Sequence, residues 1–395
     1  MRVSLWSRQA AAVILVALAV AFAGRPAAAQ LGQVETIARQ MILMDYDTGA
    51  VIFEKNSAEP MPPSSMSKLM TAYMVFEQLA AGKLRLDDSF PVSEKAWRMQ
   101  GSKMFVHVGD RVKVEDLLRG VIVQSGNDAC IVLAEGIAGT EARFSELMTE
   151  RAREIGLENS TFRNASGWPD PDHMMTARDL AILAREIIAR FPQYYHFYAE
   201  KEFTYGVDGA SKKPITQGNR NPLLYKDVGA DGLKTGHTEA AGYGLTASAK
   251  RGDRRLILVV NGLKSMNERS RESERLLELG FSQFDNVKLF QAGATVDEAD
   301  VWLGTAARVP LVVDRNIALT LPRHSRGDVK VVVTYDNPIP APIAKDTPLA
   351  TLKVVTRNAT LLEVPLTAGA DVQQLGFTGR IGAAISYLLW GAGKQ

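Results

Sequence analysis

PSSMSKLMT, residues 63–71, is the stretch of the chain that best indicates its fold. From Ser67 to Ala81 the apolar side chains recur about every 3.6 residues, which predicts a helix, and the prolines ahead of it suit a helix start. The i, i+3 spacing of Ser65 and Lys68 places a hydroxyl and an amine on one face of that helix start. A lysine whose pKa is lowered by burial or by nearby cations can take the serine proton, so this pair can form a nucleophile.

Two more motifs with reactive groups follow along the chain. SGN at residues 125–127 offers the Ser125 hydroxyl, which can relay a proton to a leaving amine, and the Asn127 carboxamide, which can bind a substrate amide. KTGHT at residues 234–238, which we expect just before a strand, offers one charge, two hydroxyls and a glycine that lets a substrate backbone approach an edge strand. Its residues are Lys234, Thr235, Gly236, His237 and Thr238.

The order of the expected elements predicts an α/β protein of the α+β type. Hairpin signals at residues 41–53 and 242–261 flank a helical region. This order favours an antiparallel sheet with helices packed on it. The expected helices cover residues 67–81, 114–137 with an interruption at 125–127, 141–155, 176–190 and, after the second hairpin, 269–280.

The sequence also predicts a domain boundary near residue 286. Short β-type runs separated by Pro, Gly, Asn and Asp begin there, and they predict a small β-rich domain over residues 286–375. This domain has no evident group of reactive side chains, so we interpret it as a spacer or an interaction module. The three motifs lie in the preceding domain, residues 30–285.

The N-terminal residues 1–29 have the pattern of a secretory signal peptide. Two arginines precede an apolar run from Ala10 to Gly24, and AAA at residues 27–29 resembles a signal-peptidase site. We therefore expect export and a mature chain that starts at Gln30. The alternative is an uncleaved N-terminal anchor, although the apolar run is short for a full membrane span.

The C-terminal residues 376–395 predict an amphipathic helix. Five apolar side chains fall on one helical face: Phe377, Ile381, Ile385, Leu388 and Leu389. The stretch is short and rich in glycine, so we expect it to lie in a membrane interface rather than to span the bilayer. The alternative is a helix that packs on its own β domain.

The composition excludes several classes of function. The 395 residues carry a net charge of +2 with acidic and basic residues interspersed, so no overall charge favours nucleic-acid binding. The single cysteine, Cys130, lies in an apolar run and is expected to be a buried core thiol, and no intramolecular disulfide can form. No two histidines have metal-ligand spacing, so we expect neither a metal nor an organic cofactor.

The three motifs, in this order, are typical of penicillin-binding proteins and class A β-lactamases. The chain resembles the low-molecular-mass penicillin-binding D-alanyl-D-alanine carboxypeptidases in PSSMSKLMT, in QSGNDAC at residues 124–130 and in DGLKTGHT at residues 231–238. The small β domain and the amphipathic tail match that family too. The resemblance implies an enzyme that removes the terminal D-Ala from peptidoglycan stem peptides ending in D-Ala-D-Ala and is inhibited covalently by β-lactams. It also implies a periplasmic protein attached peripherally to the inner membrane.

The resemblance assigns roles to the motif residues. Ser65 would be the nucleophile that forms the acyl-enzyme, Lys68 the base for acylation, and Ser125 with Lys234 the proton relay to the departing D-Ala. Asn127 would hold the substrate amide. The backbone N–H groups of Ser65 and His237 would form the oxyanion hole. Thr235, Thr238 and a later arginine would receive the terminal carboxylate.

The position of that arginine stays open between two residues. Arg269 aligns best when counted forward from the KTG motif, and Arg271 lies two residues further. An arginine fork donates two parallel hydrogen bonds and so suits a carboxylate, whereas a helix-surface charge is the alternative for either residue. His173, in the loop GWPDPDH at residues 167–173, either lines the edge of the site or is a solvated loop histidine.

Three other functions are alternatives to a carboxypeptidase. A β-lactamase usually carries a deacylating glutamate followed four residues later by asparagine, and the nearest candidate, Glu154, is followed at that distance by Glu158. A transpeptidase or D,D-endopeptidase differs only in the acceptor or in the amide that is cleaved. A non-catalytic cell-wall scaffold would have lost motif residues, and all of them are present here.

Overall fold

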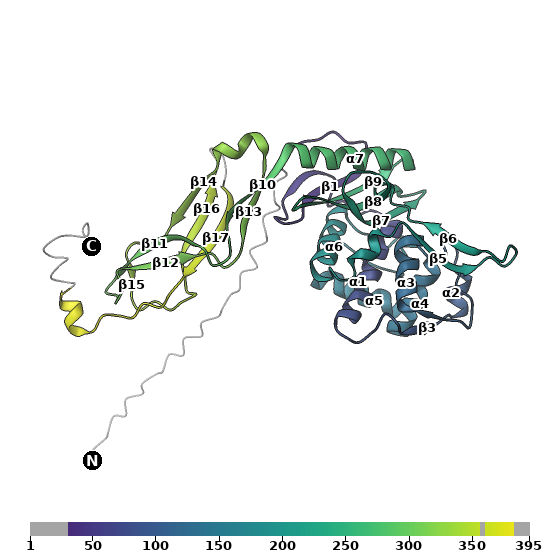
Figure 1. Ribbon diagram of the computed structural model, residues 1–395, viewed down its shortest axis with the longest axis horizontal. Coiled ribbons are helices and arrows are strands. Elements are labelled where there is room, and N and C mark those ends of the chain that lie inside the picture. Colours follow the sequence, from purple (N-terminus) through teal and green to yellow (C-terminus); the bar gives the residue numbers. More distant parts are fainter. Residues whose placement is uncertain (1–30, 356–359, 383–395) are drawn as a thin grey trace, which may run out of the picture.

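The computed structural model describes residues 31–355 and 360–382, which form a larger α/β body followed by a smaller all-β body (Figure 1). The predicted signal peptide and most of the predicted tail lie outside the described residues. In the larger body the chain makes a β-hairpin, then most of its helices, and then three more strands of the same sheet and a last long helix, α7 (Met266–Gln283). Two separate strand pairs lie between these parts: β3 (Ser89–Pro91) with β4 (Arg111–Lys113), and β5 (Glu202–Val207) with β6 (Pro214–Gly218). This confirms the predicted antiparallel sheet with helices.

A five-stranded antiparallel sheet is the centre of the larger body. Its strands follow the order β2-β1-β9-β8-β7, so the two hairpins expected from the sequence lie side by side through β1 and β9. β7 is an edge strand. The strands are β1 (Gln40–Asp45), β2 (Val51–Lys55), β7 (Ala230–Thr238), β8 (Gly242–Arg251) and β9 (Arg254–Leu263).

Helices cover both faces of this sheet, and the sequence of β9 shows why. Ile257 and Val259 belong to the apolar cluster on the face covered by most of the helices. The residues that alternate with them, Leu256, Leu258 and Val260, belong to the cluster under α7. A strand buried on both faces reads as a continuous apolar run rather than an alternating one. The helices of the first face are α1 (Lys68–Ala80), α2 (Glu94–Arg98), α3 (Val114–Arg119), α4 (Asn127–Ala138), α5 (Glu141–Glu154) and α6 (Ala177–Arg190).

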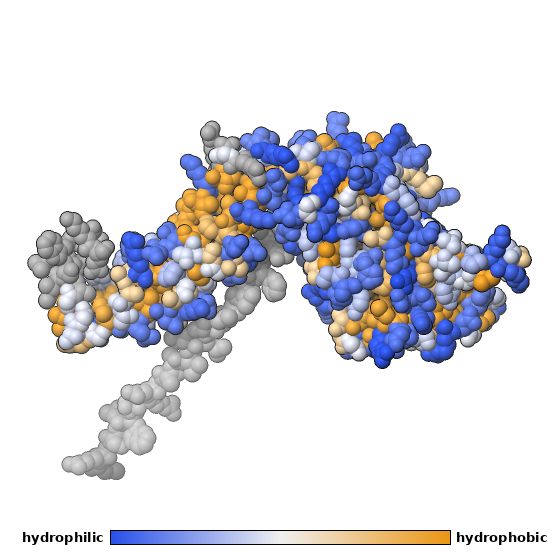
Figure 2. All heavy atoms as spheres, in the orientation of Figure 1, coloured by the Kyte–Doolittle hydropathy of each residue, from blue (hydrophilic) through white to orange (hydrophobic). Residues whose placement is uncertain are grey.

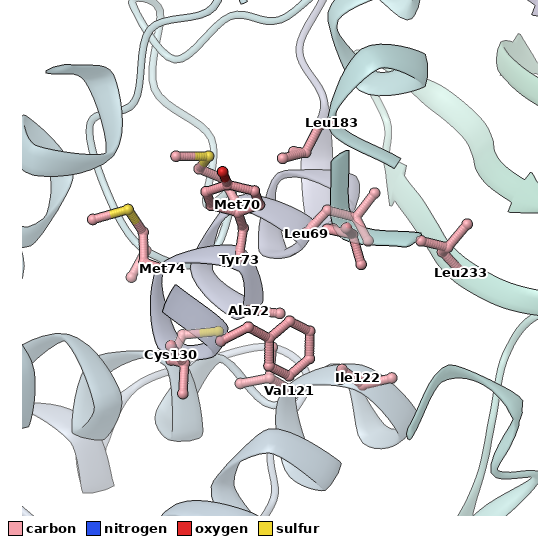
Figure 3. Packing of buried hydrophobic residues seen from close by; sticks show 14 of the residues in the cluster. Leu69, Met70, Ala72, Tyr73, Met74, Val121, Ile122, Cys130, Leu183 and Leu233 are labelled. Atoms are coloured by element: carbon pink, nitrogen blue, oxygen red, sulfur yellow. The ribbon is translucent and has the colours of Figure 1, made fainter. Parts of the chain in front are cut away.

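Helix α1 is central to this packing, and Figure 3 shows its apolar side chains surrounded on several sides. Tyr73 and Phe76 are fully buried, and they pack their rings against Phe191, which follows α6. Leu233 of β7 and Cys130 of α4 belong to the same cluster. Because the helix is held on all sides, its first residue, Lys68, has little freedom to move away from the sheet edge.

The helix expected over residues 114–137 is divided by the SGN motif. α3 continues into a short π-helical segment, Gly120–Gln124, and the chain then turns sharply at Ser125, whose φ of 62° is left-handed, before α4 begins at Asn127. A serine in this conformation is uncommon, and such positions often occur at functional sites. The predicted interruption is therefore confirmed, and it points the motif toward the sheet edge.

The smaller body is an all-β domain with its own core. A six-stranded sheet has the order β14-β16-β17-β12-β11-β15, and β10 and β13 form a separate pair. Seventeen buried apolar side chains form a cluster distinct from those of the larger body, so this domain has the core of an independent unit. The strands are β10 (Phe284–Phe290), β11 (Thr295–Trp302), β12 (Arg308–Val312), β13 (Ile317–Pro322), β14 (Lys330–Thr334), β15 (Ile339–Pro340), β16 (Pro348–Val355) and β17 (Thr360–Ala368).

A buried polar network connects the two bodies. The Asp45 carboxylate, which is fully buried, accepts a hydrogen bond from Arg254 Nε at 3.0 Å and another from Asn286 Nδ2 at 3.0 Å. The Thr320 hydroxyl donates to Asn286 Oδ1 and lies 2.6 Å from the Thr48 hydroxyl. Residues of the small domain therefore complete the hydrogen bonding of the first hairpin of the large one.

Candidate active site

The nucleophile turn lies against the edge strand of the sheet. Residues Ser64–Ser67 form a 3-10 turn that leads directly into α1, with Pro63 as its N-cap. Ser64 has a φ of 50° and its hydroxyl lies 3.2 Å from that of Thr238 at the end of β7. The turn and the strand thereby place Ser65 beside the KTGHT motif, which lies far away in the sequence.

Lys68 is the buried centre of the hydrogen bonding around Ser65. Its Nζ donates to Ser65 Oγ at 2.9 Å, to Asn127 Oδ1 at 2.7 Å and to the Ser166 carbonyl at 2.6 Å. The side chain is only 1% exposed, and this burial lowers the pKa of Lys68 to about 8, with a smaller contribution in the same direction from Arg220. An amine with this pKa can accept a proton near neutral pH.

The SGN motif completes this side of the site. Asn127 is fixed because its Nδ2 donates to the Gln100 carbonyl at 2.8 Å while its Oδ1 accepts from Lys68. Ser125 Oγ is buried and has no hydrogen-bond partner among the described residues. A buried hydroxyl without a partner is costly, and such groups in native structures commonly serve a ligand or a reaction.

The KTGHT motif forms the end of β7 and lies just before the next strand, β8, as expected. The sequence did not predict β7 itself, because a lysine, two threonines and a glycine give no apolar alternation, and the expected edge position is confirmed. Gly236 also makes a contact that we did not expect: a Cβ there would lie 2.8 Å from the Pro63 carbonyl oxygen. The glycine lets the nucleophile turn approach the strand.

Lys234 is a second buried amine beside Lys68. It is 3% exposed, and its only hydrogen bond among the described residues runs from Nζ to the Thr235 carbonyl at 3.2 Å. Burial, followed by the charges of Lys68 and Arg220, holds the pKa of Lys234 well below its usual value. Two neighbouring amines of lowered pKa can pass a proton between them through a hydroxyl such as Ser125.

A pocket of about 450 Å³ opens in front of these residues. Contributions from the nucleophile turn, the SGN turn, β7 and α7 meet in it, so the three sequence motifs form one site. The lining residues are Ser65, Ser102, Ser125, Arg220, Thr235, Gly236, His237, Tyr243, Met266 and Arg269.

The structure separates the two candidate arginines on α7. Arg269 is buried and lines the pocket, where its guanidinium lies over the Tyr243 ring and its Nε has no partner among the described residues. Burial lowers the pKa of Arg269 to about 10. Arg271 is exposed and does not line the pocket. Of these two arginines, only Arg269 is therefore placed to donate to a ligand in the pocket.

Comparison with known proteins decides the family. The model of the D-alanyl-D-alanine carboxypeptidase family matches residues 26–265, and that of the penicillin-binding protein 5 C-terminal domain matches residues 284–374. The chain belongs to the serine-type D-alanyl-D-alanine carboxypeptidase family. D-alanyl-D-alanine carboxypeptidase DacC of Escherichia coli (strain K12) is 40% identical over 352 residues, which cover 87% of this chain and 86% of that protein.

Solved structures agree with this family. Penicillin-binding protein 5 from Haemophilus influenzae superposes with a TM-score of 0.80 at 36% identity, covering 86% of this chain and 99% of that one. Penicillin-binding protein D2 from Listeria monocytogenes, solved in its ampicillin-bound form, has a TM-score of 0.56 at 28% identity and covers 63% of this chain and 99% of that one. The predicted family and fold class are confirmed.

Four residues of the pocket were not predicted from the sequence: Ser102, Arg220, Tyr243 and Met266. Arg220 donates from Nη1 to the Ser102 hydroxyl at 2.7 Å, so the carboxypeptidase site has two arginines rather than one. None of the four belongs to a motif. The only available signal for Arg220 was a charged residue between two asparagines, which is too common to single it out.

The structure decides the environments of His173 and Cys130. His173 is neither at the edge of the site nor in solvent: it is 2% exposed, and its Nε2 lies 2.8 Å from the Ser67 hydroxyl. Cys130 is buried in the apolar core, which confirms the predicted core thiol, and burial raises its pKa to about 12. Over residues 31–355 and 360–382, no three His, Cys, Asp or Glu side chains come together as metal ligands.

Proposed function

We propose that this carboxypeptidase removes the terminal D-Ala from peptidoglycan stem peptides through an acyl-enzyme on Ser65. The observation that carries the proposal is the 2.9 Å contact between Lys68 Nζ and Ser65 Oγ, combined with the lowered pKa of Lys68. Neutral Lys68 takes the Ser65 proton as Oγ attacks the carbonyl carbon of the penultimate D-Ala. The C–N bond then breaks, and water later hydrolyses the ester.

The leaving amine receives its proton through Ser125. This assignment is supported by the unpartnered Ser125 hydroxyl in the pocket and by Lys234, whose lowered pKa lets it supply or store a proton. Asn127, fixed between Gln100 and Lys68, holds the substrate amide. The backbone N–H groups of Ser65 and His237 stabilise the tetrahedral intermediate as its oxyanion forms.

The terminal carboxylate is bound by Arg269 together with the β7 hydroxyls. Burial of the guanidinium and its unpartnered Nε support Arg269 over the exposed Arg271. Thr235 lines the same pocket, and Thr238 holds the nucleophile turn through Ser64 in addition to its proposed contact. Arg220, which also lines the pocket and whose carbonyl accepts from Arg269 Nη2 at 3.2 Å, adds a second positive charge that favours an anionic ligand.

The domain limits and the cellular location are part of the proposal. The mature chain starts at Gln30 after export, the peptidase domain ends near residue 285, and the β domain extends to about residue 375. The tail then rests on the periplasmic face of the inner membrane. Exposure of Phe377 and Ile381, at the start of that tail, supports the last point. Figure 2 shows hydrophobic atoms on the surface at the far end of the small body. None of the described helices is long and apolar enough to cross a membrane.

The decisive experiment measures release of free D-Ala from a peptide ending in D-Ala-D-Ala. We expect the chain from Gln30 to release it, Ser65→Ala to be inactive, and a fluorescent penicillin to label only the former. A cross-linked muropeptide assayed in parallel tests the alternative D,D-endopeptidase activity. Release of D-Ala by Ser65→Ala would contradict the proposed nucleophile, and cleavage of the cross-link alone would replace the carboxypeptidase with an endopeptidase.

Membrane attachment has a separate test. The full mature chain should sediment with anionic phospholipid vesicles, whereas a chain that ends at residue 375 should stay in solution and keep its D-Ala release. Equal sedimentation of both chains would contradict a membrane role for the tail and favour a helix docked on the β domain.

A further inference from the structure

One loop packs against the nucleophile turn and the start of α1. In residues 163–173, which we call the clamp loop, the Ser166 carbonyl accepts from Lys68 Nζ and the Ala165 carbonyl accepts from the Thr71 hydroxyl at 2.5 Å. Gly167 is packed so closely that a Cβ would lie 1.9 Å from the Ser64 carbonyl oxygen. The loop thus contacts the turn before, at and after the lysine.

His173 closes this loop with two hydrogen bonds. Its Nδ1 accepts from the backbone N–H of Arg163 at 3.3 Å, and its Nε2 lies 2.8 Å from Ser67 Oγ. Because Nδ1 is the acceptor, Nε2 carries the proton and donates to Ser67. The ring therefore links the first residue of the clamp loop to the serine that directly precedes Lys68.

We propose that His173 is a positioning residue for acylation, which through Ser67 and the clamp loop keeps Lys68 buried and aimed at Ser65. This inference rests on the proposed roles of Ser65 and Lys68. His173 touches no part of the pocket, so it acts only through its neighbours. Its contribution is to keep water away from Lys68, because burial is the main reason that the pKa of Lys68 is low.

The charges around His173 favour the neutral ring that this role needs. Burial, the largest effect, lowers the pKa of His173 to about 4; Lys68 from α1 and Arg163 from the loop act in the same direction, and Asp170 opposes them. The uncharged Phe162 ring packs edge-on at 5.4 Å between centroids. Protonation would place an N–H on Nδ1 facing the Arg163 N–H, so this hydrogen bond is lost only when the pH falls toward 4. Its stability is complete above about pH 6.5, the usual histidine pKa, and is lost as the pH falls toward 4.

The test is the pH profile of acylation in two variants of His173. His173→Leu removes both hydrogen bonds with a side chain of similar volume. His173→Gln keeps a donor and an acceptor on its amide group. We expect the leucine variant to raise the pKa of Lys68, so that the acid limb of labelling by a fluorescent penicillin moves upward by about one pH unit. Labelling at pH 7 would then be about tenfold slower. The glutamine variant should restore most of the wild-type profile.

Two controls separate positioning from folding and from failure of the proposed function. The exposed His107→Leu should leave the profile unchanged, and Ser67→Ala, a smaller change, should shift the acid limb in the same direction even if His173→Leu does not fold. If folded His173→Leu or Ser67→Ala keeps the acid limb at the wild-type pH, the inference is overturned. This holds even if the variant has a lower melting temperature, because destabilisation alone indicates only a structural role. Labelling or turnover by Ser65→Ala would instead overturn the proposed function itself.

Discussion

Adding one methyl group at Gly236 should slow acylation as well as destabilise the fold. A Cβ there would lie 2.8 Å from the Pro63 carbonyl oxygen, 3.1 Å from Met66 Cγ and 3.2 Å from Ser64 Cβ. Ordinary contact begins at 3.4 Å, so the turn must move away from β7 by about 0.6 Å, the difference between 2.8 and 3.4 Å. A displacement approaching 1 Å between reacting groups can cost about a hundredfold in rate.

We therefore expect Gly236→Ala to lower the rate of labelling by a fluorescent penicillin by about tenfold to a hundredfold. Crowding of this kind costs about 1–3 kcal/mol of folding free energy, which urea unfolding can measure. Gly209→Ala is a matched control, because a Cβ at that position meets nothing within 4 Å. Labelling of Gly236→Ala within twofold of the wild type would refute the view that this glycine sets the distance between turn and strand.

Three further predictions concern the charged groups of the site. Acylation should rise with pH along a limb centred near 8, the pKa of Lys68, because only its neutral amine can accept the Ser65 proton; a flat profile from pH 6 to 9 would contradict this base. Arg269→Ala should raise the KM for peptides ending in D-Ala-D-Ala about tenfold or more, and Arg271→Ala should not; equal effects would count against Arg269 as the carboxylate ligand. Lys234→Met should abolish turnover but raise the melting temperature at pH 7. Because the pKa of Lys234 is depressed in the folded state, the wild type gains stability as the pH rises toward about 10.4. The difference in melting temperature between Lys234→Met and the wild type should therefore shrink as the pH rises. A difference that stays constant with pH would exclude the buried charge of Lys234 as its cause.

The sequence predicted the parts of this protein that depend on local patterns. The 3.6-residue period predicted α1, and the i, i+3 spacing predicted that Lys68 lies beside Ser65. In the structure Lys68 Nζ lies 2.9 Å from Ser65 Oγ. Apolar runs around Asp and Gly turns predicted both hairpins of the sheet. These features need only neighbouring residues, so one sequence is enough to infer them.

The contacts between distant segments were beyond the same reasoning. Gly236 was predicted to meet substrate backbone, and nothing near it in the sequence shows that it also lies against the turn at Pro63, which is far away in the chain. His173 was expected in solvent or at the edge of the site, because nothing near it in the sequence shows that its ring bonds to Ser67 and Arg163 in the interior. Arg220 belongs to no motif, and its place in the pocket comes with a hydrogen bond to Ser102, which lies far away in the chain. In each case the missing information is tertiary packing rather than residue chemistry.

The electrostatics of the pocket connect these observations to the choice of substrate. Arg220 and Arg269 line it, Lys68 and Lys234 are buried beside them, and no carboxylate is among the described lining residues. Buried cations without counter-charges are costly, and their lowered pKa values are one sign of that cost. A free C-terminal carboxylate brings the missing negative charge to this position, whereas an internal peptide bond in an ordinary chain brings none. Under the proposed assignment, preference for a terminal residue follows from the charges that the fold leaves unbalanced.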